Sequence, residues 1–291
     1  MAAAGRVANL DLRTSSAPPS GADVLARLLA KVRPLVMGVL NVTPDSFSDG
    51  GRFLDASTAI AHARTMAAEG ADIIDVGAES TRPYGGAVRV TVDEERARLA
   101  PVLSEVIGLG VPVSIDTMKA AVAAWAVESG ATIINDVWGL QRDPDMVRVV
   151  AECAAGVIIM HNRDKADPAI DIVTEVTAFF RRSLDIAARA GIARDRIVLD
   201  PGIGFGKTPE QSITCIARLD AWRGLGLPLL VGASRKRFIN SITPSDPMQR
   251  LGGSLAAHLL AVEHGAAIVR VHDVAPTIQA LAVAAAIRRA R

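Results

Sequence analysis

Short apolar runs alternate with longer amphipathic segments along most of the chain. Each run is rich in β-branched residues and is followed by a polar or glycine-containing loop and then by an Ala-rich segment. The runs are too short for helices, whereas segments such as 56–69, 92–106 and 170–190 have helical length and period. The eight runs that we interpret as strands are LVMGVL (35–40), DIIDVG (72–77), VPVSI (111–115), TIIND (132–136), GVIIM (156–160), RIVLD (196–200), PLLVGA (228–233) and AIVRV (267–271).

This alternation predicts an α/β protein with parallel strands joined by right-handed crossovers. Eight such units match a closed (β/α)8 barrel, the TIM barrel, for which about 250 residues are typical. An open doubly wound sheet is the alternative, and it normally carries a Gly-rich dinucleotide turn after its first strand. Here the first run is followed by Asn41-Val-Thr-Pro-Asp instead.

The residues before the first run form a separate feature. The stretch TSSAPPSGAD (14–23) is a loop by composition, and the VLARLLAKV that follows has leucines at helical spacing. We therefore predict an N-terminal extension, 1–33, that is partly flexible and contains a short helix. Residues 34–291 are predicted to form one catalytic barrel.

Composition narrows the classes of partner. The 291 residues carry a net charge of +1 without blocks of either sign, which argues against nucleic-acid or anionic-membrane binding and favours a small molecule. No apolar run approaches the ~20 residues of a membrane span, and the N-terminus does not have the pattern of a signal peptide. Cys153 and Cys215 are not in a CxxC pattern, so we expect reduced thiols in a cytoplasmic protein.

Polar residues stand at the end of every run. In such barrels the C-terminal strand ends supply the catalytic groups. So many charges on one rim would be costly to desolvate without a polar ligand. For Asp75 and Asp136 we favour a structural role, in which the carboxylate ties down loop backbone. The rim residues are Asn41, Asp75, Glu79, Asp116, Asn135, Asp136, His161, Asp200, Ser234, Lys236, Arg270 and His272.

The last two strands carry an anion-binding pattern. Arg270 and His272 are two apart on a strand, so their side chains share a face and suit a phosphate or diphosphate. An ion pair with Asp273 or a neighbour is the alternative. The run Ser234-Arg235-Lys236 adds a hydroxyl, two cations and a helix start on the neighbouring strand.

Two motifs have weaker interpretations. DPGIGFGKT (200–208) misses the Walker A pattern at Pro201 and the GxGxxG pattern at Lys207, so its glycines are interpreted as a tight turn that leaves Asp200 and Phe205 facing the cavity. Thr208 or Pro209 would start the next helix. His161 has no second histidine at metal-ligand spacing and is interpreted as a rim or structural residue.

Two polar connections are unusually long, NVTPDSFSDGG (41–51) and ESTRPYGGAVRV (79–90). Barrel connections usually have ~2 to 6 residues, so we interpret both as mobile lids over the catalytic face.

Taken together, MGVLNVTPDSFSDGG, DVGAESTRP, SIDT, IIND, LDPGIGFGK, LLVGASRKRF and VRVHDV resemble the dihydropteroate synthase family, the sulfonamide targets of folate biosynthesis. The resemblance extends in the family's order from Leu35 to the C-terminus. It implies a (β/α)8 barrel and a transferase that joins 6-hydroxymethyl-7,8-dihydropterin diphosphate to 4-aminobenzoate, giving 7,8-dihydropteroate and diphosphate. It also implies Mg2+ and a homodimer.

The resemblance assigns residues to four roles. Those implied in catalysis are Asp116, Asp200 and Lys236. Those implied at the pterin are Asp116, Asn135, Met160, Asp200 and Lys236. Those implied at diphosphate are Asn41, which also serves Mg2+, Arg82, Arg270 and His272. Those implied at 4-aminobenzoate are Thr81, Pro83, Phe205, Ser234 and Lys236. The implied mechanism is dissociative, with diphosphate leaving before the amine attacks.

The sequence departs from the family at TRPYGGA, which replaces a shorter turn, and at His161-Asn-Arg-Asp-Lys, so drug response and the contribution of these loops stay open. Two alternatives remain beside the synthase. One is a pterin-binding methyltransferase barrel, which has no use for Ser234-Arg235-Lys236 or a diphosphate site. The other is a non-catalytic pterin-binding paralogue, which would be expected to carry damage in these motifs.

Overall fold

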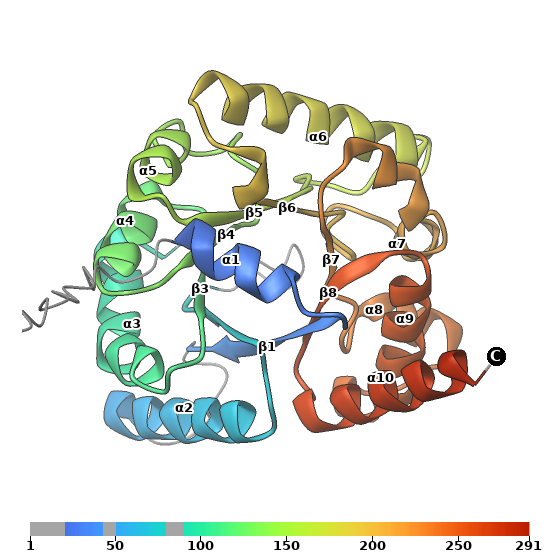
Figure 1. Cartoon of the computed structure of the whole chain (residues 1–291), viewed down its shortest axis with the longest axis horizontal. Helices are drawn as coiled ribbons and strands as arrows, with labels where there is room; N and C mark the ends of the chain where they lie inside the picture. The colour runs from blue at the N-terminus through green and yellow to red at the C-terminus, as the bar shows by residue number, and fades with distance from the viewer. Residues whose placement is uncertain (1–20, 43–50, 80–89, 291) are drawn as a thin grey trace, which may run out of the picture.

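The computed structural model describes residues 21–42, 51–79 and 90–290. Within these residues, parallel strands form a closed barrel in sequence order, and β1 pairs with β8 to complete it (Figure 1). The predicted (β/α)8 barrel is confirmed. The strands are β1 (Leu35–Asn41), β2 (Ile73–Gly77), β3 (Val113–Asp116), β4 (Ile133–Asp136), β5 (Gly156–Met160), β6 (Ile197–Asp200), β7 (Leu229–Val231) and β8 (Ala266–Val271).

Helices surround the barrel on all sides (Figure 1). They are α1 (Gly21–Leu29), α2 (Gly51–Ala68), α3 (Val92–Ile107), α4 (Ala120–Glu128), α5 (Met146–Cys153), α6 (Ile172–Arg189), α7 (Pro209–Ala217), α8 (Arg237–Ile242), α9 (Leu251–Glu263) and α10 (Val274–Arg289). Short 3-10 turns lie at η2 (Arg194–Arg196), η3 (Leu219–Leu225) and η4 (Pro247–Gln249). Among these described helices, none has the length and hydropathy needed to cross a membrane.

The observed strands match the predicted runs to within a few residues. The run 156–160 coincides with β5, whereas 228–233 shortens to Leu229–Val231. The shortening follows from pairing, because β6 and β7 align only at Leu199 and Leu229 and the β7–β8 register shifts between Leu229 and Leu230. Apolar periodicity marks the strand but does not show where its partners stop pairing.

The core has two main layers. One fills the space between the strands and the outer helices and contains buried side chains such as Leu40, Phe180 and Trp222. The other fills the N-terminal end of the barrel, where Leu35 and Met37 meet inward-facing residues of β2 and of β4 to β8. This packing fixes the strands and holds their C-terminal ends in position.

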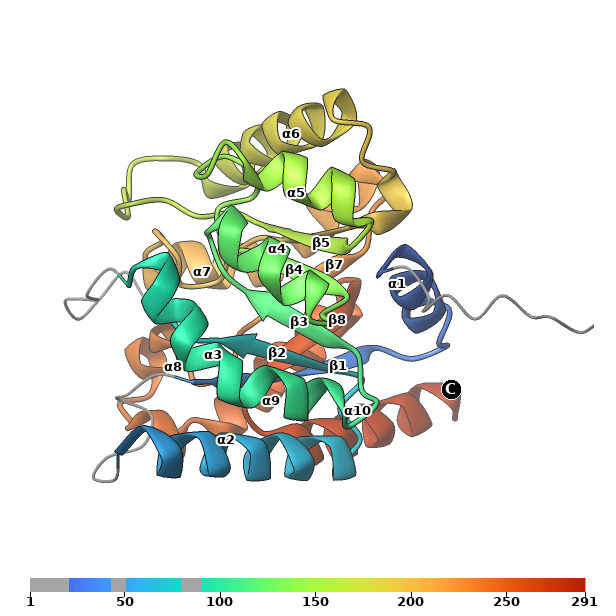
Figure 2. The same cartoon turned by 90° about the vertical axis from the view of Figure 1, so that its left-hand side faces the viewer.

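Helix α1 closes the N-terminal end of the barrel (Figure 2). Its Val24, Leu25 and Leu28 are buried in the same cluster as the inner strand residues. Fully burying one such side chain stabilises a fold by roughly 1.5–3 kcal/mol. The predicted short helix is present, and its apolar face belongs to the barrel core.

Basic residues after α1 hold it to the barrel. Lys31 Nζ lies 2.6 Å from Asp72 Oδ1, and Arg33 binds both oxygens of Asp72 at 2.7 and 2.8 Å. The Val36 amide donates to the same carboxylate at 2.9 Å. Burial raises the pKa of Asp72, but the hydrogen bonds from Arg33 and Lys31 outweigh it and bring the pKa below its ordinary value.

Candidate functional site

A buried ionic network occupies the C-terminal end of the barrel. Arg270 on β8 donates from Nε to Asp75 on β2 at 2.6 Å and from Nη2 to Asp116 at the end of β3 at 2.7 Å. Asn135 at the end of β4 donates from Nδ2 to Asp75 at 3.1 Å. Three of the predicted site residues, Asp116, Asn135 and Arg270, are thus brought together around Asp75.

Burial changes the charge states in this network. It raises the pKa of Asp116 to about 7, against the lowering effect of Arg270 and with a further raising effect from Asp75. Burial acts to lower the pKa of Arg270, but Asp75 and Asp116 raise it above its ordinary value. The guanidinium therefore stays charged, while Asp116 can titrate near neutrality.

Three buried oxygens in this network are left with spare hydrogen-bonding capacity. Within the described residues, Asp75 Oδ1, Asp116 Oδ1 and Asn135 Oδ1 have no hydrogen-bond donor. A buried acceptor without a donor costs about 1–3 kcal/mol, so several in one place are typical of a site that binds a ligand with N–H groups.

The contacts of Asp75 differ from the predicted role in tying down loop backbone. Its carboxylate does not tie down loop backbone but contacts the side chains of Arg270 and Asn135. The prediction for Asp136 is confirmed, because its carboxylate accepts from the amides of Trp138 at 2.9 Å and Leu140 at 2.6 Å. A single sequence cannot separate these roles, since both residues end a buried strand.

An apolar wall stands beside the ionic network. Val137, Met160 and Phe205 form a small buried cluster, with Met118 and Trp138 packed against it. Lys236 Nζ lies 4.1 Å from the centre of the Phe205 ring. Methionine and phenylalanine next to a cation and carboxylates provide the mixed lining that a flat polar ring requires.

The loop from 200 to 208 is a tight turn, as predicted. Asp200 Oδ1 accepts from the Gly202 amide at 2.7 Å, and Gly202 has a positive φ of 66°. Burial raises the pKa of Asp200 to about 6, and the Gly202 amide and Lys236 act in the opposite direction. Thr208 caps α7 with Pro209 as its first residue, which confirms the expected helix start.

The ends of β7 and β8 contact each other. His272 Nδ1 lies 3.0 Å from Ser234 Oγ, so the histidine expected at diphosphate and the serine expected at 4-aminobenzoate are neighbours. Arg235 does not join them, because it pairs with Asp273 at 2.5 and 3.1 Å. The ion pair with Asp273 that was considered for Arg270 is therefore made by Arg235.

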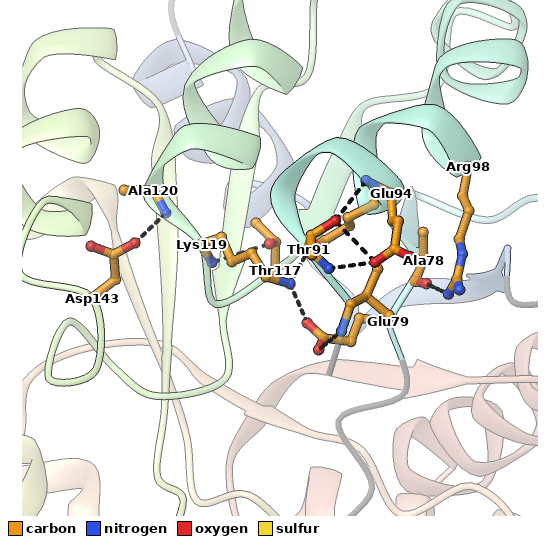
Figure 3. A network of polar contacts seen from close by, with 11 residues as sticks. Ala78, Glu79, Thr91, Glu94, Arg98, Thr117, Lys119, Ala120 and Asp143 are labelled. Atoms are coloured by element: carbon orange, nitrogen blue, oxygen red, sulfur yellow. Dashed lines mark hydrogen bonds and ion pairs between the residues drawn. The ribbon is translucent and has the colours of Figure 1, made fainter. Parts of the chain in front are cut away.

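A second ionic cluster lies where β3 leads into α4. Lys119 Nζ lies 2.5 Å from Glu79 Oε2 (Figure 3) and 2.5 Å from Glu95 Oε2. Glu79 also accepts from the Val90 amide at 3.2 Å, so it joins the two described ends that flank residues 80–89. Lys119 is three residues after Asp116 in the sequence. Its ion pair with Glu79 fixes the point at which the connection after β2 begins.

Hydrogen bonds at the start of α3 and after β2 lie next to this cluster (Figure 3). Thr91 and Glu94 form a capping box at the start of α3, and Arg98 Nη1 donates to the Ala78 carbonyl at 2.9 Å. Sequence reasoning did not identify Lys119. Its signal was available in retrospect as a lysine near the end of a strand that must pass acidic residues at 79 and 95.

Some predicted residues are placed only in part. Thr81, Arg82 and Pro83, with the TRPYGGA turn and most of both long connections, lie outside the described residues. Asn41 ends β1 and is partly exposed at the rim. The described residues contain no group of three His, Cys, Asp or Glu that could hold a metal ion.

A cavity of about 540 Å³ lies at the opposite end of the barrel, next to α1. It is lined by residues such as Leu28, Ile107 and Thr132, none of which is a rim residue. The chemistry at the C-terminal end is therefore located by its buried charges and not by the volume of this cavity.

Comparison with known proteins agrees with this geometry. The family described as pterin binding enzyme matches residues 37–272. A dihydropteroate synthase of Bacillus subtilis is 46% identical, over 84% of this chain and 85% of its own, and that of Escherichia coli is 42% identical, over 86% and 90%. The chain belongs to the dihydropteroate synthase family. Like its relatives, this member of the dihydropteroate synthases is a transferase.

Two structures of other dihydropteroate synthases extend the comparison. That of Clostridium difficile, determined in the presence of pteroic acid, has a TM-score of 0.85 and 46% identity and covers 89% of this chain and 98% of its own. That of Xanthomonas albilineans with 4-aminobenzoic acid has a TM-score of 0.84 and 45% identity and covers 88% and 94%. The predicted family, fold and enzyme class are confirmed.

Proposed function

We propose that the rim binds 6-hydroxymethyl-7,8-dihydropterin diphosphate and 4-aminobenzoate and joins them as a dihydropteroate synthase. The observation that carries the assignment of residues is the cluster of buried carboxylates with spare acceptor oxygens beside an apolar wall. A pterin has one edge of N–H donors and two flat faces. The acceptors match the edge and the wall matches a face.

Asp200, Asn135 and Asp116 recognise the pterin in this proposal. An ionised Asp200 accepts two parallel N–H bonds from the amidine-like edge, and Asn135 both donates to and accepts from the ring. Met160 lies against the ring face, next to Phe205. Lys236 donates to the pterin carbonyl and ring nitrogen, which balances the two carboxylates.

Arg270, His272, Asn41 and Arg82 receive the diphosphate. Arg270 is already in place, because Asp75 and Asp116 fix two of its nitrogens. The described residues do not form a full metal cage, but one amide oxygen from Asn41 fits Mg2+, which usually keeps water and substrate phosphate oxygens as its other ligands. Bound Mg2+ would offset charge on the diphosphate.

The 4-aminobenzoate site lies between Phe205 and the end of β7. Phe205 and Lys236 contact each other there, and Ser234 is next to His272. The substrate ring packs on Phe205, and its carboxylate is held near Ser234, with Thr81 and Pro83 completing the site. The amine then points towards the pterin methylene carbon.

The reaction proceeds in two steps. The C–O bond between the pterin methylene carbon and diphosphate breaks first, and its electron pair leaves with the diphosphate oxygen. The positive charge left on the pterin is stabilised by the Asp116 carboxylate. The aromatic amine nitrogen then forms the new C–N bond and releases its proton to water. A neutral aromatic amine is nucleophilic enough to need no strong base.

Diphosphate release tests the function directly. Purified protein with Mg2+ and both substrates should release diphosphate and form 7,8-dihydropteroate in equal amounts, and omitting 4-aminobenzoate should stop product formation. Exchange of the exposed Asp164 for Asn serves as a control that should retain activity. Tight pterin binding without any product would contradict the synthase and favour a methyl-transferring or non-catalytic pterin barrel.

A homodimer and a cytoplasmic location complete the proposal. Leu260 on α9 and Val283 and Ile287 on α10 are exposed apolar side chains on neighbouring helices, which suits a surface that packs against a second copy. Cys153 and Cys215 are both free thiols, as expected in a reducing compartment. Sedimentation analysis of wild type and Ile287→Asp would show whether the dimer forms through these helices.

A further inference from the structure

One buried lysine binds three neutral acceptors close to the proposed substrate site. Lys207 is 2% exposed, and its Nζ lies 2.6 Å from His161 Nδ1, 2.9 Å from the Gly202 carbonyl and 3.1 Å from the Phe205 carbonyl. An ammonium group has three donors, and here each has an acceptor. Burying a charge in this way is costly, so the contacts it makes have to be specific.

The contacts of Lys207 define the shape of the loop that carries Asp200 and Phe205. Both carbonyls belong to this loop, and His161 follows β5 on the neighbouring strand. The Phe205 amide donates to the Gly202 carbonyl at 3.1 Å, so the ammonium binds the same turn that this hydrogen bond closes. The Lys207 ammonium thus contacts two carbonyls of the same loop, those of Gly202 and Phe205.

Glycines allow the loop to approach its neighbour closely. A Cβ at Gly202 would lie 2.0 Å from the His161 carbonyl oxygen, and one at Gly206 would lie 2.4 Å from the side chain of Arg163. Both glycines also have positive φ, where a side chain would add strain. The backbone on both sides of Lys207 is consequently fixed by close packing, and Phe205 has little freedom to move.

His161 is suited to the acceptor role. It is fully buried and packs edge-on against Phe179, with 4.9 Å between ring centres. Burial lowers the pKa of His161 to about 2, and the positive charges of Lys207 and Arg163 act in the same direction. A neutral imidazole can accept at Nδ1 from the ammonium.

We propose that Lys207 is a positioning residue for 4-aminobenzoate, which acts by holding the Phe205 backbone so that the ring presents its face to the substrate next to Lys236. This inference rests on the proposed function, in which Phe205 contacts 4-aminobenzoate. Asp200 ends β6 and is held by the barrel, but the charge of Lys207 helps to lower its pKa, so binding of the two substrates is compared at pH 8, well above the Asp200 pKa of about 6.

Replacing Lys207 by methionine tests the proposal. Met fills a similar volume but cannot donate, so the loop loses all three contacts. We expect K207M to raise the KM for 4-aminobenzoate by about tenfold, which corresponds to about 1.4 kcal/mol, and to leave the dissociation constant of pterin diphosphate within about twofold. An unchanged KM, or an equal loss for both substrates, would overturn the proposal.

Arg196 offers a matched control. It is also a buried cation bound to backbone carbonyls, donating to Ala155 O from Nε at 2.9 Å and from Nη2 at 2.7 Å, but it lies at the start of β6, at the other end of the barrel. R196M should lower the melting temperature and leave both substrate constants unchanged. If K207M behaves like R196M, Lys207 has only a structural role.

A double-mutant cycle tests whether Lys207 acts through Phe205. We expect Phe205→Ala to raise the KM for 4-aminobenzoate and K207M to add no further increase in that background, because both changes remove the same contact. Multiplied effects would show that Lys207 does not act through Phe205.

The outcome of Phe205→Ala alone bears on the proposed function. If it leaves the KM unchanged, Phe205 does not contact 4-aminobenzoate, and both assignments fail. If it raises the KM while K207M does not, the inference fails and the proposed function stands. Should K207M not fold, His161→Phe removes one of the three acceptors, and it must still raise the KM for 4-aminobenzoate.

Discussion

The two ends of the barrel treat a buried carboxylate in opposite ways. At the N-terminal end, Asp72 is bound by Lys31, Arg33 and the Val36 amide, and its pKa lies below the ordinary value despite burial. At the C-terminal end, burial raises the pKa of Asp116 to about 7 and that of Asp200 to about 6. Both oxygens of Asp72 have donors, whereas among the described residues Asp116 Oδ1 has none.

The consequences for stability have opposite signs. Asp72 contributes stability that is present above its unfolded pKa near 3.8 and is lost as the pH falls through its lower folded pKa. For Asp116 and Asp200 the folded state holds its protons more tightly. Their effect on stability is therefore most favourable in acid and is lost as the pH rises from about 4 towards 6 to 7. The site is maintained at the expense of stability near neutral pH.

The largest effect is expected where the cation shared by two carboxylates of the rim is removed. Lys119→Met leaves the buried Glu79 and Glu95 without their cation. Removing one partner of a buried ion pair costs about 3–5 kcal/mol, which urea unfolding would measure. Arg64→Met, which breaks the exposed pair with Glu105, should change stability by less than about 1 kcal/mol. Similar losses for both variants would show that the Lys119 cluster is not effectively buried.

Asp200→Asn should separate function from stability. We expect pterin affinity to fall by about 3 kcal/mol, or more than about hundredfold, because an amide cannot accept both N–H bonds of the pterin edge. The free energy of unfolding at pH 8 should rise by about 1–2 kcal/mol, because a buried carboxylate with a raised pKa is removed. Calorimetric binding and urea unfolding measure the two quantities. A less stable D200N would contradict the comparison of the two ends.

Asp72→Asn should have the opposite profile. We expect it to lower the free energy of unfolding by about 2 kcal/mol at pH 7, because hydrogen bonds from Arg33 and Lys31 to a charge are weakened. The loss should shrink as the pH falls below 3.8, where the unfolded carboxyl is protonated. Steady-state kinetics should give wild-type constants for both substrates. Altered constants would show that the two ends are coupled.

The smallest effect concerns pH. If Asp200 binds the pterin as proposed, it must be ionised to accept both N–H bonds, so affinity should fall about tenfold, or about 1.4 kcal/mol, for each pH unit below about 6. Titration of pterin binding between pH 5 and 8 would reveal the bend. The same titration of D200N should lose the bend near pH 6, although Asp116 still titrates near pH 7. A bend retained near pH 6 in that variant would assign the effect to another group.

The sequence predicts the scaffold better than the contacts. The alternation of apolar runs and amphipathic segments indicates the barrel, and strand ends such as Asp116, Asn135, Asp200 and Arg270 indicate its active rim. These inferences depend only on order along the chain. The sequence suggests a backbone-binding role for Asp75, whereas the structure shows side-chain contacts. Its partners, Arg270 and Asn135, belong to strands that are distant in the sequence.

Lys119 and Lys207 show a second kind of limit. Each is surrounded by acceptors from separate segments, Glu79 and Glu95 for one and His161 with two loop carbonyls for the other. The acceptors of each lysine do not recur at a regular spacing in the sequence, so hydrophobic periodicity cannot predict these contacts. Helix α1 is an intermediate case, since its leucine spacing indicates a helix, but its burial depends on the shape of the barrel end.

Arg270 also links the active site to the order in which the polypeptide is made. Its contacts with Asp75 and Asp116 span 195 and 154 positions, and its strand pairs with β1 to complete the sheet. Until β8 has been synthesised, both β1 and β7 are open edges and the two carboxylates have no guanidinium. Such long-range closure is slow to form. A single late event therefore closes the barrel and brings the guanidinium to Asp75 and Asp116, so a chain interrupted before β8 lacks both the closed sheet and this ionic network.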